Sequence, residues 1–189
     1  MRIGYAVCGS FCTHEKSIEV LKRLTEKFKG AEIIPILSEN TSSTDTKFGR
    51  AEEFRKKISA VTSAHFVSSI PQAEVFGPTL PLDLLIISPC TGNTLAKLAL
   101  GITDTTVTMA AKAHLRSDRP CLIALASNDA LSANLKNIST LLSRKNVYFV
   151  PMIQDSPEKK PHSLIADFEL VCECAHLALS SKQLRPLFR

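Results

Sequence analysis

The chain has 189 residues, of which 44% are hydrophobic and 22% are charged, and it contains six cysteines and no tryptophan. This composition is ordinary for a globular domain, so it excludes a disordered chain, a collagen-like repeat and a small disulfide scaffold. The net charge of +5 comes from 23 basic and 18 acidic residues spread along the chain, and no basic stripe indicates nucleic acid as a partner.

The apolar segments are all short. The longest runs, residues 84–87 and 121–126, fall far below the roughly 20 residues that a membrane-spanning helix needs. The first apolar stretch ends at Gly9, which is too early for a secretory signal. We therefore predict no membrane segment and a cytoplasmic protein with free thiols. The cysteines lack a second Cys or His pair at ligand spacing, so no metal site is predicted.

The amino-terminal half alternates apolar runs with amphipathic stretches. Residues 3–8 predict a buried strand, and residues 17–29 carry apolar side chains at helical spacing up to Gly30. The other elements predicted in this half are a strand at 32–37, a helix at 49–61 and a short strand at 65–67.

The second half repeats this alternation. Residues 82–88 form an apolar run broken only by Asp83, which is typical of a parallel strand covered on both faces. The elements predicted after it are helices at 91–100 and 105–115, a strand at 121–126, a helix at 130–142, a strand at 147–150, a proline-rich loop at 151–161 and a helix at 164–180.

Strands separated by helices predict βαβ units with right-handed crossovers. The predicted fold class is therefore α/β, a three-layer Rossmann-like (flavodoxin-like) doubly wound parallel sheet. We expect residues 1–189 to form a single domain, with a carboxyl-terminal loop and helix (about 151–180) packed on it. In such sheets ligands bind beyond the carboxyl ends of the strands, so the residues that follow each strand are the candidates for a site.

Small and polar residues follow the first two predicted strands. After the first, Gly9 permits close backbone approach, and Ser10 or Thr13 can cap the next helix while leaving N–H groups for an anion. This turn matches neither a Walker A sequence nor GxGxxG, so it is either a phosphate loop or a plain connection. After the second strand, residues 38–44 are rich in hydroxyl and amide groups, as in an ordinary polar loop or a loop that contacts a cofactor.

The segment at 88–99 is the most informative. A buried strand ends at Pro89, and small polar residues then open a helix. Thr91 or Asn93 can cap this helix, and Thr94 can donate its hydroxyl to an anion near the positive end of the helix dipole. The alternative is an ordinary cap whose Thr and Asn side chains satisfy the local backbone.

The sequence from Pro89 to Asp104 contains the pattern Pro-x-x-x-Asn-Thr-x-x-Lys-x-x-x-Gly-x-x-Asp. This pattern resembles the motif of the FMN-binding flavoprotein superfamily that includes the cysteine and phosphopantothenoylcysteine decarboxylases. The resemblance is closer to the B subunits of dipicolinate synthase and runs nearly end to end. It covers Gly9-Ser10 and the segments 44–49, 89–104, 109–113, 127–129 and 148–161.

The resemblance implies a fold with an FMN site, and its functional residues carry over by position. The catalytic residue stays unknown. The implied cofactor contacts are Gly9 and Ser10 at the phosphate, Ser38 at the ribityl or phosphate side, Thr91, Gly92, Asn93 and Thr94 around the phosphate and flavin edge, and Ser127 facing the ring.

Two departures from the decarboxylases stand out. Their catalytic His aligns near Val75, where this chain has apolar residues and no His between His65 and His114. Their carboxylate-binding Asn aligns with Asp129, and an ionised Asp repels a substrate carboxylate. These two departures from the family pattern disfavour decarboxylation.

The implied activity is that of an oxidoreductase subunit. It would act with the dehydrogenase-like A subunit of dipicolinate synthase, which would carry a nicotinamide cofactor (NADP). Together they would oxidise a dihydro- or tetrahydrodipicolinate precursor to pyridine-2,6-dicarboxylate in the mother cell of a sporulating bacterium. Homo- or hetero-oligomers are expected.

The alternatives are a non-catalytic scaffold with a degenerate flavin pocket and, with less support, an FMN-dependent decarboxylase. Candidate groups for a dianionic substrate are the cations Lys47, Arg50, Lys112 and Lys159; the alternative for each is ordinary solvated surface charge. Candidate proton-transfer groups are His14 and His162, because imidazole titrates near neutrality; the alternative for each is an ordinary helix-end or loop residue.

Overall fold

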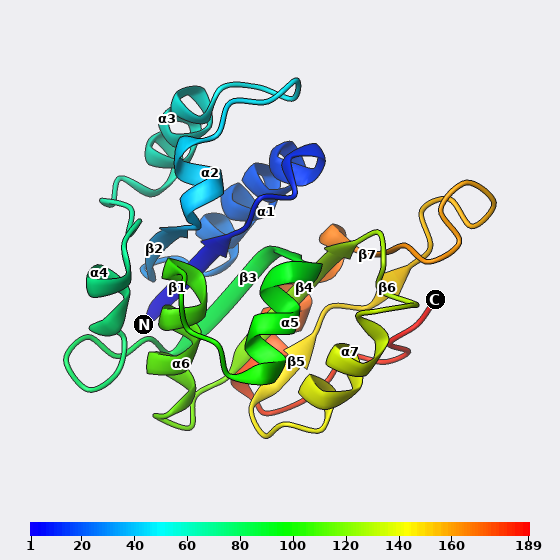
Figure 1. Cartoon of the computed structure of the whole chain (residues 1–189). Helices are drawn as coiled ribbons and strands as arrows, with labels where there is room; N and C mark the ends of the chain where they lie inside the picture. The colour runs from blue at the N-terminus through cyan, green and yellow to red at the C-terminus, as the bar shows by residue number, and fades with distance from the viewer.

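A seven-stranded sheet runs through the centre of the molecule (Figure 1). The structure is a computed structural model and describes the whole chain, Met1–Arg189. The strands are β1 (Arg2–Val7), β2 (Glu32–Leu37), β3 (Leu84–Thr91), β4 (Cys121–Ser127), β5 (Val147–Phe149), β6 (Met152–Ile153) and β7 (Leu164–Ala166). Their hydrogen-bonded order is β2-β1-β3-β4-β7-β6, and β5 also pairs with β4.

The sheet is mostly parallel. The pairs formed by β1, β2, β3, β4 and β5 are all parallel, whereas β7 runs antiparallel to β4 and to β6. β3 is buried up to its last residue, as expected for a parallel strand covered on both faces. The predicted fold class is confirmed, with an antiparallel strand added near one edge.

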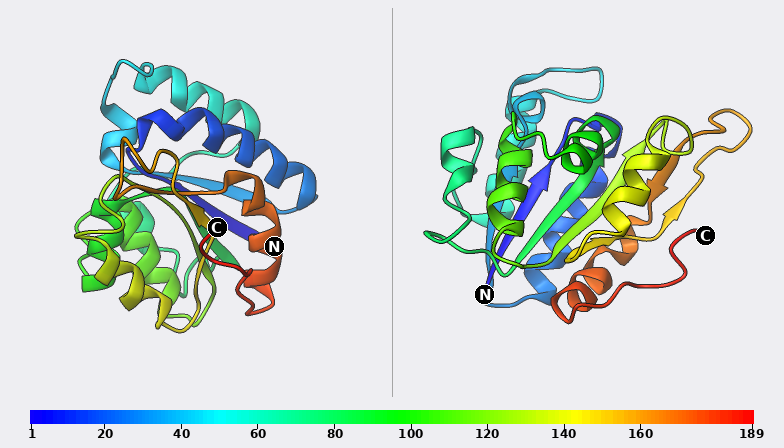
Figure 2. Two further views of the ribbon diagram at one scale, coloured as in Figure 1. Left: turned by 90° about the vertical axis from the view of Figure 1, so that its right-hand side faces the viewer. Right: turned by 60° about the horizontal axis from the view of Figure 1, so that its bottom comes forward.

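Helices cover both faces of the sheet, which gives three layers (Figure 2). One face packs on α1 (His14–Lys27), α3 (Ala51–Thr62) and α8 (Val171–Leu179). The other packs on α4 (Ile70–Glu74), α5 (Gly92–Leu100), α6 (Thr106–Leu115) and α7 (Leu135–Leu142). Each face has its own apolar core because each helix turns its apolar stripe toward the strands.

The elements β1 to β5 and the longer helices confirm the sequence predictions, with bounds that differ by a few residues. Three short elements were not predicted: α2 (Glu39–Ser43), α4 and the 3-10 helix η1 (Phe11–Thr13). The short strand expected at 65–67 is reduced to one bridge between Val67 and Ile36.

The predictions for the carboxyl-terminal third were partly wrong. The helix expected at 164–180 begins as strand β7, continues as the 3-10 helix η2 (Phe168–Leu170), and becomes α-helical only in α8. Pairing of β7 with both β4 and β6 satisfies its backbone, which local helical spacing cannot reveal. The loop expected at 151–161 contains β6, and the helix expected at 130–142 starts only with α7.

The carboxyl-terminal tail runs back along the sheet edge (Figure 2). Phe188 forms a parallel bridge with Met152 of β6. The side-chain amide of Gln183 accepts from the Phe149 N–H at 2.8 Å and donates to the Phe149 carbonyl at 2.7 Å. Gln183 thus stands in for a strand partner on β5. None of the helices is both long and apolar enough to cross a bilayer.

Candidate functional site

The loops that follow β1, β2, β3 and β4 lie side by side at the carboxyl end of the sheet (Figure 1). The Cys8 N–H donates to the Pro89 carbonyl at 3.1 Å, and the Ser38 N–H donates to the Val7 carbonyl at 3.0 Å. Thr91 pairs in register with Ala126 of β4. The predicted site residues therefore lie in one row, in the order Ser38, Gly9 and Ser10, the Thr91–Thr94 turn, and Ser127.

The turn after β1 has uncommitted donors. A Cβ atom on Gly9 would lie 3.4 Å from Asn40 Cβ, an ordinary contact, so the turn is not crowded. The Gly9 N–H makes no hydrogen bond within the chain, and the Ser10 hydroxyl has only a 4.0 Å contact with Cys12 Sγ. The expectation that Ser10 or Thr13 caps the next helix with its side chain is wrong, because the Thr13 hydroxyl instead donates to the Ser10 carbonyl at 2.8 Å.

The turn before α5 uses some of its polar side chains for internal hydrogen bonds and leaves one exposed. Thr91 is the cap, because its hydroxyl accepts from the Thr94 N–H at 3.3 Å and donates to the Thr94 hydroxyl at 3.1 Å. Thr94 is buried, and its hydroxyl takes part in this hydrogen bond within the chain. Asn93 is exposed and its amide makes no hydrogen bond within the chain. Asn93 is thus the free polar side chain of this turn.

A carboxylate in the loop after β4 lies beside the start of α5. Asp129 Oδ1 accepts from the Ser127 hydroxyl at 2.5 Å, and the Asn134 amide donates to both carboxylate oxygens at 2.9 and 3.0 Å. These hydrogen bonds hold the pKa of Asp129 below its usual value. A Cβ atom on Gly92 would lie 2.9 Å from Asp129 Oδ1 and 2.7 Å from Asn134 Nδ2. Asp129 therefore acts as an internal acceptor beside the positive end of α5.

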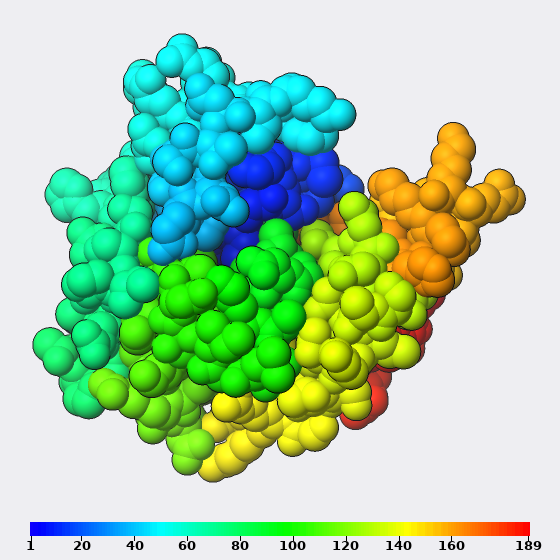
Figure 3. All heavy atoms as spheres, in the orientation of Figure 1, coloured from blue at the N-terminus to red at the C-terminus, as the bar shows by residue number.

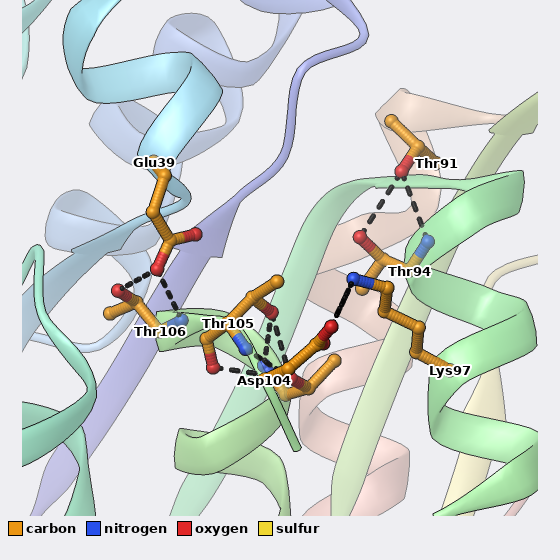
Figure 4. Close-up of polar contacts among 8 residues, drawn as sticks. Glu39, Thr91, Thr94, Lys97, Asp104, Thr105 and Thr106 are labelled. Carbon is orange, nitrogen blue, oxygen red and sulfur yellow. Dashed lines mark hydrogen bonds and ion pairs between the residues drawn. The ribbon is translucent and has the colours of Figure 1, made fainter. Parts of the chain in front are cut away.

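A second carboxylate occupies the start of α6, a contact that the sequence analysis missed (Figure 4). Glu39 Oε1 accepts from the Thr106 N–H at 2.8 Å and from the Thr106 hydroxyl at 2.7 Å. Thr105 and Thr108 complete a capping box at the same helix end. The capping box can be read in the sequence, but the partner Glu39 is 67 residues away in the chain.

The motif residues Lys97, on α5, and Asp104, just before α6, form an ion pair (Figure 4). Lys97 Nζ lies 2.8 Å from Asp104 Oδ1 and 3.0 Å from Oδ2, and the ammonium lowers the pKa of Asp104. The pair therefore links the last turn of α5 to the segment just before α6, which gives the spacing of these two motif residues a structural reason.

His14 has a structural place in this site. It is 8% exposed, its Nε2 lies 3.0 Å from the Cys8 carbonyl oxygen, and its ring stacks on Phe54 with centroids 4.2 Å apart. Burial lowers the pKa of His14, so the ring stays neutral near pH 7. The ring of His14 lies between the aromatic side chains of Phe11 and Phe54. This position favours a structural role for His14 over proton transfer. His162 is exposed on the loop after β6, which projects from the body of the molecule in orange (Figure 3).

The candidate cations for a dianionic substrate do not gather in one place. Arg50 borders a small hollow beside Phe11 and His14, near the row of polar turns. Lys112 lines a different cavity, which lies between the carboxyl-terminal ends of α5 and α6. This cavity is at the end of the sheet opposite the polar turns. The expectation that these cations serve one substrate is therefore wrong for Lys112. No three His, Cys, Asp or Glu side chains come together in a way that could hold a metal ion.

Comparison with known proteins identifies the family. The family model described as Flavoprotein matches residues 1–174. The B subunit of dipicolinate synthase from Bacillus subtilis is 42% identical over 186 residues, which are 98% of this chain and 92% of that protein. The chain belongs to the flavoprotein family, in its branch of dipicolinate synthase B subunits. The resemblance inferred from the sequence motifs is confirmed.

Solved flavoprotein structures share the fold. The crystal structure of the dipicolinate synthase B subunit from Bacillus halodurans has a TM-score of 0.90 at 40% identity and covers 100% of this chain and 95% of that one. The FMN-dependent cysteine decarboxylase SpaF has a TM-score of 0.69 at 25% identity, with 95% of this chain and 97% of that one covered. This flavoprotein thus keeps the architecture of both over nearly its whole length.

The donor set of the polar turns fits a phosphate-bearing cofactor. The Gly9 N–H, the Ser10 hydroxyl and the Asn93 amide are all free of close partners within the chain. Neutral donors of this kind bind phosphate oxygens, and the missing Cβ atom at Gly9 permits close backbone approach. The residues present therefore suit FMN in composition.

Proposed function

We propose that this flavoprotein binds FMN across the polar turns at the carboxyl end of its sheet. The free donors Gly9, Ser10 and Asn93 would contact the phosphate and the flavin edge directly. The other proposed contacts, Ser38, Thr91, Gly92, Thr94 and Ser127, shape the surface, because most of their side-chain hydroxyls already bond within the chain. FMN-dependent SpaF, which shares this fold, supports the choice of cofactor. When bound, FMN supplies a hydride acceptor that protein side chains lack.

We further propose that the chain acts as one component of dipicolinate synthase. It would work with the dehydrogenase-like A subunit, which would carry NADP, and oxidise a dihydro- or tetrahydrodipicolinate precursor to pyridine-2,6-dicarboxylate. The observation that carries this proposal is the 42% identity to a B subunit of dipicolinate synthase over 98% of the chain. The reaction places the protein in the mother cell of a sporulating bacterium, as part of a homo- or hetero-oligomer.

A scaffold role is the second candidate, and a specific observation favours it. Asp129 and Glu39 put internal carboxylates beside the starts of α5 and α6, where a phosphate would otherwise gain from the helix dipole. Under this second candidate the site would bind FMN weakly or not at all, and the chain would stabilise or position the dehydrogenase-like partner. An independent decarboxylase has less support, because the chain lacks a His near Val75 and commits Asp129 to internal hydrogen bonds.

Three measurements separate these functions. An absorption spectrum of the purified chain, taken after incubation with FMN and removal of free cofactor, is expected to show flavin bands. Turnover of the dehydrogenase-like partner is then compared with and without this chain. Faster turnover by the pair supports the role in dipicolinate synthase. An equal rate for the partner alone would remove the catalytic role, and absent flavin bands would leave the scaffold candidate. Release of carbon dioxide from an acidic thiol by the isolated chain would favour the decarboxylase.

Asn93→Ala tests the placement of FMN. Asn93 is exposed and has no partner within the chain, so its removal leaves the fold intact and deletes a donor to the cofactor. We expect FMN affinity to fall by about tenfold, as for loss of a single hydrogen bond of about 1.4 kcal/mol. Fluorescence titration of FMN measures the change. Thr140→Ala, an exposed polar-to-alanine change on α7, is the control and should leave the affinity unaltered. Equal affinity for Asn93→Ala and the control would contradict the placement.

A further inference from the structure

A second cavity lies at the end of the sheet opposite the polar turns. It has a volume of about 460 Å³ and opens between the carboxyl-terminal ends of α5 and α6 and the turn that leads from α7 to β5. Cavities of roughly 300–1,000 Å³ are the size that holds small molecules in proteins. None of the lining residues belongs to the polar turns, so the cavity is distinct from the proposed FMN site.

Positive charge dominates the cavity. Its lining carries Lys112, Arg116, Arg144 and Lys145, and Asp118 is the single carboxylate among the lining residues. Asp118 is already committed, because Lys145 Nζ lies 3.0 Å from Oδ2 and the Asn146 amide donates to Oδ1 at 3.1 Å. No carboxylate lies within ion-pair distance of the other three cations. Three of the lining cations, Lys112, Arg116 and Arg144, therefore have no carboxylate partner.

Each of the two guanidinium groups lies against a segment of backbone. Arg144 Nη1 donates to the Leu98 carbonyl, near the end of α5, at 3.2 Å. The Arg116 guanidinium lies against Gly77, where a Cβ atom would come within 2.8 Å of Nε. A guanidinium has five N–H donors in a fixed fork, so most of them stay free for an anion. The chain therefore holds Arg144 in place, whereas the guanidinium N–H groups of Arg116 are free because they make no hydrogen bond within the chain.

One wall of the cavity is apolar. Leu98, Ile102 and Leu115 line it, and Ile102 is 42% exposed. An inorganic anion would leave this wall in contact with water, whereas an anion with a small apolar body would cover it. The lining therefore favours an organic anion over a bare one.

Helix electrostatics explain only part of this arrangement. Cations stabilise helix carboxyl termini, which accounts for Lys112 in the last turn of α6 and for the contact of Arg144 with Leu98. The same effect requires neither a cavity with an apolar wall nor a guanidinium seated on Gly77. We propose that this cavity binds a small organic dianion, a phosphomonoester or a dicarboxylate, through Lys112, Arg116 and Arg144.

Calorimetric titration of the full chain tests the proposal, with phenyl phosphate and benzene-1,3-dicarboxylate as probes at low ionic strength. We expect saturable binding at one site per chain for at least one probe, and the tighter probe identifies the anion class. Inorganic phosphate is expected to bind more weakly than phenyl phosphate because it cannot cover the apolar wall. Each titration is repeated with FMN present and should be unchanged, since the two sites lie at opposite ends of the sheet.

Matched charge variants locate the site. Lys112→Gln with Arg116→Gln is expected to weaken binding by at least tenfold. Lys27→Gln with Lys29→Gln removes the same charge from exposed positions at the end of α1 and should have little effect. Equal weakening by both double variants, loss of binding when FMN is added, or no saturable binding of either probe would overturn the proposal. FMN binding is measured separately by the absorption spectrum of the purified chain, so failure of this proposal and failure of the proposed function are distinguishable.

Discussion

Gly92→Ala is expected to lower the free energy of unfolding by about 1–3 kcal/mol and to impair FMN binding. A Cβ atom at this position would lie 2.7 Å from Asn134 Nδ2 and 2.9 Å from Asp129 Oδ1, and would also collide with the Ser127 hydroxyl. These groups are held together by hydrogen bonds, so none can move away without breaking one. Urea denaturation and FMN titration measure the two effects.

Gly9→Ala is the matched control for the stability effect. A Cβ atom on Gly9 would lie at least 3.4 Å from its nearest neighbours, so the free energy of unfolding should change little. The same atom would project into the polar turns and hinder close approach of a phosphate to the Gly9 N–H. We therefore expect a stable variant with weakened FMN binding. A Gly92→Ala protein as stable as Gly9→Ala would show that the contacts around Gly92 are not tight.

Asp129→Ala is expected to lower the free energy of unfolding by about 1–3 kcal/mol. The substitution removes the acceptor of the Ser127 hydroxyl and of the Asn134 amide. Asn134 is only 5% exposed, so its amide would be buried with an unsatisfied donor. Asp155→Ala is the control, because the hydrogen-bond partner of that carboxylate is Lys160, on an exposed loop. Its free energy of unfolding should change less than that of Asp129→Ala.

The effect of Asp129→Ala should depend on pH in a defined direction. The pKa of Asp129 is lower in the folded chain than in the unfolded chain, where it is about 3.9. The contribution of the Asp129 carboxylate to the free energy of unfolding is therefore complete above its pKa in the unfolded chain. This contribution is lost as the pH falls through its lower pKa in the folded chain. We expect the stability difference between the two proteins to be constant from about pH 8 to pH 5 and to shrink below about pH 4. A difference that grows on acidification would contradict this assignment.

Residues close together in sequence made much of the fold predictable. The buried run that became β3 and the cap at Thr91 depend on neighbours within a few positions, and both were expected. β7 was missed because its backbone partners, β4 and β6, are supplied by distant segments. The helical spacing after residue 164 belongs to α8 and gives no information on how the preceding residues pair.

The candidate site shows the same division. Gly9 and Ser10 were named from their position after a strand, and the family resemblance implied Asn93 as a cofactor contact. The structure leaves the donors of all three free. No local pattern indicates that Glu39 binds the start of α6 or that Asp129 lies against Gly92. Both contacts join segments whose meeting depends on sheet order and loop paths.

The amino-acid sequence by itself indicated the family, through the resemblance of its motifs. It also determined the alternation of strands and helices and the polar turns at the strand ends, because periodicity and capping act between near neighbours. Only the tertiary structure decided which charges meet. Carboxylates lie beside the starts of α5 and α6. Arg50 and Lys112 line two separate hollows at opposite ends of the sheet. Electrostatic contacts depend on distance in space, which packing of the whole chain sets.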